Sequence, residues 1–360
     1  MALTWPPLLL ADPSPCLRWL VLRDIFHRAE RAADAEMAEL APLREADPLV
    51  ADILALQDSD GSWRPGALAA SRAGSSHVQM TAFALTRLGY LGFNRTHRAV
   101  ARGAKYLFAQ QRSDGSWPLS KDAALTDGNS ELPPKERYSM IPLQTAFPLR
   151  GLAACGYATD PRAERAYEWL LAQRLPDGAW PTGVAAGVYG YVGGYRRLAH
   201  SRWGCRSNTT GALICFALHP QRRTSAEARR ALDLLLGRET REAHTLGYEV
   251  ARLVGAEVPR GMFTFFARFD LALILDLCSR VGATRDDPRV ADVLKFVLSL
   301  RGEYGLWEYA GYTQRHRPQV SRWLTFDLMR SISRLDKNVD WVAMEPRTPF
   351  RPYPKRGKRF

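Results

Sequence analysis

Residues 110–117 read Gln110-Gln111-Arg112-Ser113-Asp114-Gly115-Ser116-Trp117, and this stretch recurs along the chain. It closes an apolar, helix-patterned run, and Asp-Gly after such a run indicates a turn at a helix C-terminus. Similar stretches occupy residues 56–63 and 173–180, and a weaker copy occupies residues 300–307. Four copies in one chain of 360 residues predict a repeat protein.

A second landmark, a short apolar helix start, follows each copy after a loop. Five such starts lie 57 to 64 residues apart, and residues 17–22 fit the same slot one unit earlier. The spacing therefore predicts six units of roughly 60 residues. The first residues of the five later starts are Met80, Gln144, Asn208, Asp270 and Asp327.

Each unit has the pattern of a helical hairpin. The first helix is nearly all apolar, as in residues 271–278, and is expected to be buried on every side. The second mixes charged and apolar residues at helical spacing, as in residues 163–171, and is expected to lie outside. Six such hairpins predict an all-α fold, a closed α6/α6 toroid. An open solenoid is the alternative, but it needs polar terminal caps, and the last unit keeps an apolar helix.

The composition and the extent of the repeats indicate the domain division and the possible partners. The repeats run almost end to end, so we interpret residues 1–340 as one toroid domain and residues 341–360 as a basic, flexible tail. Residues 184–195, rich in glycine and aromatics, are interpreted as a loop. The sequence contains no apolar run of 18 or more residues. The net charge of +13 could serve an anionic membrane face, whereas no motif indicates a nucleic-acid partner.

The N-terminal residues and the cysteines indicate where in the cell the protein is expected. Residues 3–10 are apolar but lack the basic flank of a signal peptide. Cys155, Cys215 and Cys278 lie in apolar helices, where they are expected to be buried, and the five cysteines show no paired metal spacing. We therefore predict a cytoplasmic protein, with peripheral membrane contact as an option.

The repeat resembles the one shared by squalene/oxidosqualene cyclases and protein prenyltransferase β subunits, over about residues 15–335. The resemblance implies an α6/α6 barrel in which the Gln and Trp of each copy tie neighbouring outer helices together. It also implies a deep, apolar, aromatic-lined cavity for an isoprenoid, entered from the end where the inner helices begin. The long loops of the predicted toroid share that end, and binding residues often lie on such loops.

Two departures from the family pattern limit what the resemblance implies. Class II cyclases carry Asp-x-Asp-Asp, whose middle acid protonates an alkene, and this sequence has no such motif. Cys205 matches the zinc-ligand Cys of the prenyltransferases, but Trp203 stands where their Asp stands, and no His matches their later ligand. Because a catalytic zinc needs three protein ligands, we expect neither a metal nor another cofactor.

Asp270 and Asp327 are the candidate catalytic residues, each expected to begin an inner helix at the cavity mouth. The helix dipole and free backbone N–H groups favour a carboxylate there, so simple N-capping is the structural alternative. Burial against aromatic rings would instead raise the pKa of the carboxyl group and keep a proton available for transfer.

A basic segment precedes the predicted inner helix at residue 208. Counting back from Cys205, Arg197 and His200 fall on the positions of the basic pair that holds the diphosphate in prenyltransferase β subunits. A solvated basic loop is the alternative. The aromatic residues near the inner ring would also stabilise a carbocation through their π faces. The predicted substrate-binding residues are Tyr195, Arg197, His200, Arg202, Trp203, Phe269, Phe326, Gln144 and Asn208.

These features predict a terpenoid-cyclase-like enzyme, an isomerase or lyase, that binds a polyprenyl chain or a prenyl diphosphate in an apolar barrel and promotes carbocation cyclisation. Initiation would be by protonation from Asp270 or Asp327, or by diphosphate ionisation near Arg197. The alternative is a non-catalytic barrel, derived from a cyclase, that binds an isoprenoid, another lipid or a protein. A carbohydrate-active toroid with two carboxylates is disfavoured because the inner helices are apolar.

Overall fold

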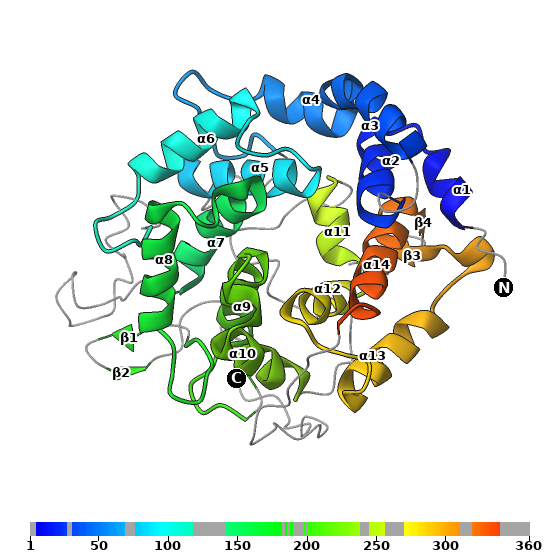
Figure 1. Ribbon diagram of the computed structural model, residues 1–360. Coiled ribbons are helices and arrows are strands. Elements are labelled where there is room, and N and C mark those ends of the chain that lie inside the picture. Colours follow the sequence, from blue (N-terminus) through cyan, green and yellow to red (C-terminus); the bar gives the residue numbers. More distant parts are fainter. Residues whose placement is uncertain are drawn as a thin grey trace.

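The computed structural model describes residues 5–26, 31–68, 76–117, 142–181, 184–185, 188–189, 198, 200–237, 245–255, 270–309 and 319–338. Helices dominate these residues and form two concentric rings (Figure 1). The inner ring consists of α2 (Pro15–Val21), α5 (His77–Tyr90), α7 (Pro142–Leu152), α9 (Arg206–Leu218), α12 (Leu271–Val281) and α14 (Arg322–Leu335). The outer ring consists of α3 (Arg31–Leu43), α4 (Pro48–Ala55), α6 (Arg98–Ala109), α8 (Pro161–Ala172), α10 (Ala226–Leu236) and α13 (Pro288–Ser299).

Shorter elements complete the described fold. Helix α1 (Trp5–Leu10) precedes the first inner helix, and α11 (Tyr248–Leu253) lies inside the ring. Two antiparallel strand pairs are formed by β1 (Val184–Ala185) with β2 (Val188–Tyr189) and by β3 (Trp307–Tyr309) with β4 (Gln319–Ser321). The single-turn helices are η1 (Leu22–Phe26), η2 (Arg44–Ala46), η3 (Ala153–Tyr157), η4 (Arg222–Thr224) and η6 (Glu303–Gly305).

The all-α toroid expected from the repeats is confirmed. Six inner helices begin close to the predicted slots, and the first of them covers residues 17–21. The interpretation of residues 184–195 as a loop is wrong in part, because two residue pairs there form the β1–β2 hairpin. The predicted tail, residues 341–360, lies outside the described residues.

The repeated tryptophan joins each hairpin to the next through hydrogen bonds. Trp63, Trp117, Trp180 and Trp307 are fully buried. Each indole N–H donates to a carbonyl ten residues earlier, at the end of its own outer helix, at 2.7–2.8 Å. Each main-chain N–H donates to a threonine hydroxyl on the next inner helix at 3.0–3.2 Å; the acceptors are Thr81, Thr145, Thr209 and Thr325.

The glutamine of the repeat makes the second tie. The Gln57 amide donates to the carbonyl of Ala99 in the next outer helix at 2.9 Å. Gln111 makes the same bond to Arg162, also at 2.9 Å. The tie between neighbouring outer helices is thus present in the first two copies. In the copies at residues 173–180 and 300–307, arginine replaces the glutamine and bonds within its own turn.

The ring closes where the first and last repeat units meet. Leu9 and Leu17 from the first unit pack with Leu306 and Phe326 from the last unit in one buried cluster. Helix α1 contacts both α2 and α14, and Figure 1 shows it at this seam. An ion pair between Arg322 and Asp12 at 3.1 Å joins the same two units. Because this seam is packed and paired, the open-solenoid alternative is excluded.

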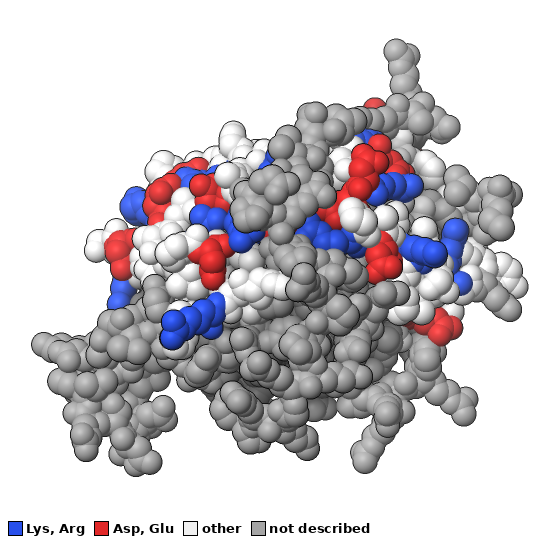
Figure 2. All heavy atoms as spheres, turned by 90° about the horizontal axis from the view of Figure 1, so that it is seen from below, with Lys and Arg blue, Asp and Glu red and all other residues white. Residues whose placement is uncertain are grey.

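Two features of the described residues are relevant to membrane contact. None of the helices in the described part of the chain is both long and apolar enough to cross a membrane. On the face shown in Figure 2, the described basic and acidic side chains are interspersed.

Candidate functional site: an arginine-rich cavity inside the ring

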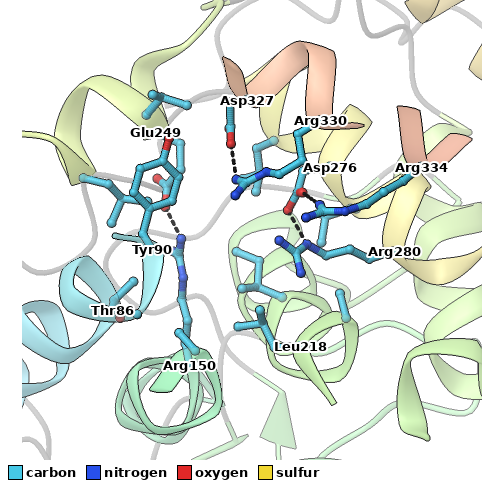
Figure 3. Close-up of a pocket in the computed structure, with 18 of the residues that line it drawn as sticks. Thr86, Tyr90, Arg150, Leu218, Glu249, Asp276, Arg280, Asp327, Arg330 and Arg334 are labelled. Carbon is cyan, nitrogen blue, oxygen red and sulfur yellow. Dashed lines mark hydrogen bonds and ion pairs between the residues drawn. The ribbon is translucent and has the colours of Figure 1, made fainter. Parts of the chain in front are cut away.

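A cavity of about 240 Å³ opens inside the ring. It lies where the inner helices end, as shown by the residues that line it (Figure 3). Tyr90 ends α5, Arg150 lies in the last turn of α7, and Leu218 ends α9. Arg280 and Arg334 lie in the last turns of α12 and α14. This cavity is therefore at the end of the barrel opposite to the expected mouth.

Its lining is amphipathic. Among the residues that the structure describes, five arginines and three carboxylates line the cavity: Arg23, Arg150, Arg280, Arg330, Arg334, Glu249, Asp276 and Asp327. An aliphatic wall comes from α9, α11 and α12 and includes Ile214, Leu218, Leu253, Leu273 and Leu277. The expectation of an apolar, aromatic-lined cavity is wrong for this space, in which Tyr90 is the one aromatic residue of the described lining.

Asp276 holds two of the arginines. Its carboxylate accepts from Arg280 Nε at 2.7 Å and from an Arg334 amino group at 2.9 Å. Burial alone would raise the pKa of Asp276, but Arg280, Arg334 and Arg330 outweigh it and lower the pKa to about 2. Burial, with Arg280 and Arg330 nearby, lowers the pKa of Arg334 to about 9. Cations are therefore crowded on this side of the cavity.

Asp327 lines the cavity in an ion pair with Arg330 (Figure 3). Burial raises the pKa of Asp327, and Asp276 adds to this effect while Arg330 opposes it. Arg330 also contacts Asp24 at 3.2 Å. The expectation that Asp327 begins an inner helix is wrong: α14 starts five residues earlier, and Ser321 is its N-cap.

Helix α11 is fixed in the ring by a buried ion cluster. Glu249 contacts both Arg150 of α7 and Arg252 of its own helix at 2.5 Å. Burial alone would raise the pKa of Glu249, but Arg150 and Arg252 lower it. The carboxylate therefore stays ionised and holds α11 against α7.

Asp270 lies apart from this cavity, and the structural alternative accounts for its contacts. It is the N-cap of α12 and accepts from Ala272 N at 3.0 Å. It also accepts from Gly247 N at 3.0 Å and Glu249 N at 2.6 Å, at the start of α11. Burial raises the pKa of Asp270 to about 6 against these backbone bonds. Its carboxylate therefore fastens α11 to α12, and a catalytic role for it stays a prediction.

Three predicted binding residues are buried within the helical scaffold. Asn208 is buried and its side-chain oxygen accepts from Leu143 N at 3.0 Å, which ties α9 to the start of α7. Gln144 is buried in the first turn of α7. Phe326 packs in the seam cluster with Leu17. None of the three lines the described cavity, so a role in binding there is not supported by their positions.

The remaining predicted residues belong to the segment before α9 or lie outside the described residues. His200 is exposed, with a left-handed φ of +60°. The exposed Arg202 guanidinium lies 5.2 Å from the ring of the half-buried Trp203. These three residues precede α9, whereas the cavity contains the end of that helix. Tyr195, Arg197 and Phe269 lie outside the described residues.

Metal-binding groups do not converge in the described part of the chain, where no three His, Cys, Asp or Glu side chains form a candidate metal cluster. All five cysteines are buried. Burial raises the pKa of the Cys215 thiol to about 12, as expected for a small residue in an apolar core.

Sequence reasoning missed most of the charged cavity, although a signal was present. Arg150, Asp276 and Arg330 are charged residues within helices that the pattern places at the centre of the ring. Charged groups are rarely buried without partners. A search for charges in otherwise apolar inner helices would therefore have found them.

Comparison with known proteins agrees with this architecture. The family model for the squalene-hopene cyclase C-terminal domain matches residues 41–193, which include the three strong copies of the repeat. A squalene–hopene cyclase of Zymomonas mobilis is 27% identical over 151 residues, covering 42% of this chain and 21% of that protein. A lanosterol synthase of Candida albicans is 28% identical over 143 residues, covering 39% of this chain and 18% of that protein. Residues 41–193 are therefore similar to the squalene/oxidosqualene cyclase superfamily, and the chain spans only about a fifth of the length of these relatives.

Solved structures give a distant likeness. The type II terpene cyclase MstE from Scytonema superimposes with a TM-score of 0.34 at 15% identity, over 81% of this chain and 97% of that one. The same enzyme in complex with geranylgeranyl dihydroxybenzoate gives a TM-score of 0.35 at 15% identity, over 81% and 96% of the two chains. A protein from Actinoplanes gives 0.32 at 13% identity, over 80% and 97%.

Proposed function

We propose that this protein is a terpenoid-cyclase-like enzyme that binds the reactive end of a prenyl diphosphate inside the ring and promotes carbocation formation and cyclisation. The observation that carries the proposal is the mixed lining of the cavity, in which an excess of arginines over carboxylates is combined with aliphatic side chains from α9, α11 and α12. A prenyl diphosphate has the same two chemistries, an anionic head and an aliphatic chain. A cavity of about 240 Å³ is below the ~300–1,000 Å³ of typical ligand pockets, so it is assigned to the head and the first part of the chain.

Diphosphate ionisation fits this cavity better than alkene protonation. In ionisation the C–O bond breaks with its electron pair going to the diphosphate, and an allylic carbocation remains, which cyclises and then loses a proton. Arginines stabilise the charge that develops on such a leaving group. Protonation needs a carboxyl group that both holds a proton and is free to reach the substrate. Burial raises the pKa of Asp327 and Asp270, but Asp327 is paired with Arg330, and Asp270, which does not line the cavity, accepts three backbone N–H groups.

The test is incubation of the purified protein with farnesyl diphosphate, geranylgeranyl diphosphate and squalene. The expected result is a cyclic product with release of diphosphate from one of the two prenyl diphosphates, and no conversion of squalene. Conversion of squalene alone, or a cyclic product that keeps its diphosphate, would contradict the ionisation route.

The second candidate is a non-catalytic barrel that binds an isoprenoid or another lipid. One observation favours it: both carboxyl groups that were candidates for the acid hold structural contacts. Extraction of the purified protein and mass spectrometry of the extract distinguish the two. A bound lipid together with no turnover of any prenyl substrate supports the binding protein.

A further inference from the structure

Three residues that line the cavity each have a buried polar atom without a partner among the described residues. The Tyr90 hydroxyl, Arg150 Nη1 and Arg330 Nε are buried and have no hydrogen-bond partner among the described residues. All three belong to cavity-lining residues. Every one of them can donate, and two belong to guanidinium groups, which cannot accept at all. Because a buried donor without an acceptor is unfavourable, a ligand that supplies acceptor atoms would be favoured at this site.

The three residues lie around the same space, and Arg330 and Tyr90 are in cation–π contact. Figure 3 shows Tyr90 and Arg150 on one side and Arg330 on the other. The Arg330 guanidinium carbon lies 5.5 Å from the centre of the Tyr90 ring. Arg150 and Arg330 are more than nine-tenths buried, with side-chain exposures of 9% and 6%. A ligand in the cavity would therefore lie among residues of α5, α7 and α14.

The charged residues that line the cavity also favour an anionic ligand. Last-turn arginines such as Arg280 and Arg334 have an ordinary role, since the ends of helices carry partial negative charge. The partial negative charge at the helix ends also disfavours a bound anion. An anion site here therefore needs more arginines than are required to neutralise the helix ends and the carboxylates. The described lining supplies two more arginines than carboxylates. Asp276, Asp327 and Glu249 each already hold at least one of the arginines.

We propose that this cavity is a phosphate- or diphosphate-binding site in which Arg150, Arg330 and the Tyr90 hydroxyl hold the anion. The site lies at the ends of the inner helices, away from the segment before α9 where sequence analysis expected the diphosphate. It deepens the proposed function, on which the prenyl group rests, but binding of the anion itself does not depend on turnover.

The experiment is calorimetric titration of the full-length protein with inorganic diphosphate at low ionic strength. The most informative variant is Tyr90→Phe, because the hydroxyl it removes makes no bond within the described structure and its loss leaves no protein group unpaired. Saturable binding is expected in the wild type, with affinity lower by about tenfold or more in Tyr90→Phe. Arg150→Gln should weaken binding at least as much, while Glu249 keeps Arg252 as its partner.

Arg87→Gln is the matched control. Arg87 is also a buried arginine in the last turn of an inner helix, but it does not line the cavity. Its replacement should change diphosphate affinity by less than about threefold, a difference below the loss of one charged hydrogen bond. Thermal melting of each variant establishes that it is folded at the titration temperature.

The titration results distinguish failure of the anion site from failure of the proposed enzymatic function. Absence of saturable binding in the wild type, or wild-type affinity in both Tyr90→Phe and Arg150→Gln, would overturn the site. Diphosphate binding that depends on these residues, with no turnover of a prenyl diphosphate, keeps the site and removes the proposed enzyme. Farnesyl diphosphate binding tighter than inorganic diphosphate assigns the site to a prenyl head group, whereas equal affinity assigns it to free diphosphate.

Discussion

The main-chain N–H of Trp117 donates to the hydroxyl of Thr145 at 3.2 Å, joining the turn after one outer helix to the next inner helix. Both residues are fully buried, so no solvent replaces the hydroxyl if it is removed. Thr145→Val keeps the shape and leaves a buried donor unpaired. We expect the free energy of unfolding to fall by about 1–3 kcal/mol, measured by urea denaturation.

The control for this prediction is Thr86→Val. The Thr86 hydroxyl donates to the carbonyl of Ala82 in its own helix, at 2.8 Å. Its removal leaves no donor unpaired, so a loss below about 1 kcal/mol is expected. Equal losses in the two variants would show that the contact between repeats has no special importance.

The pH dependence of the free energy of unfolding should show the raised pKa of Asp270. Its pKa is about 6 in the folded protein and 3.8 ordinarily, so the folded state binds the proton more tightly. The contribution of this group to stability is then greatest below the ordinary pKa and is lost as pH rises through the folded pKa. The stability difference between wild type and Asp270→Asn should fall by about 1–3 kcal/mol between roughly pH 4 and pH 7.

Asp160→Asn serves as the comparison in the same titration. Asp160 also caps a helix, but its bond to Arg162 lowers its pKa. The wild-type advantage over this variant should not fall as the pH is raised over that range. A pH-independent difference for Asp270→Asn would contradict the buried, raised pKa of Asp270.

The two initiation routes differ in their dependence on Asp327. If ionisation starts the reaction, Asp327→Asn should keep turnover of the prenyl diphosphate within about tenfold, because the carboxyl group transfers no proton. If Asp327 were the acid, its loss should lower the rate by about 10²–10⁴-fold. Product formation by gas chromatography distinguishes these results, and Asp24 still pairs with Arg330 in the variant.

The seam of the ring depends on Phe326, which the sequence pattern predicts to be a substrate-binding residue. Phe326→Ala should lower the free energy of unfolding by about 3–5 kcal/mol, the usual cost of removing a buried aromatic ring. Amide exchange should increase in α1 and α2, which share the seam. Unchanged stability combined with lost ligand binding would instead support the binding role.

Repeat patterns made much of the fold predictable. The Gly-Ser-Trp turns and the apolar starts depend on residues close in sequence, so their spacing indicated inner and outer helices and six units. The capping role of Asp270 was foreseen as an alternative for the same reason, since a cap requires only a carboxylate next to a helix start.

The sequence by itself therefore determined the class of fold, the repeat and the buried inner ring, because these follow from local periodicity. Only the tertiary structure decided where charges meet. Arg23, Tyr90, Arg150 and Arg330 come from four different inner-ring segments, and closure of the ring brings them to one cavity. No local pattern encodes which ends of separate helices converge, since that depends on helix lengths, crossing geometry and the position of α11.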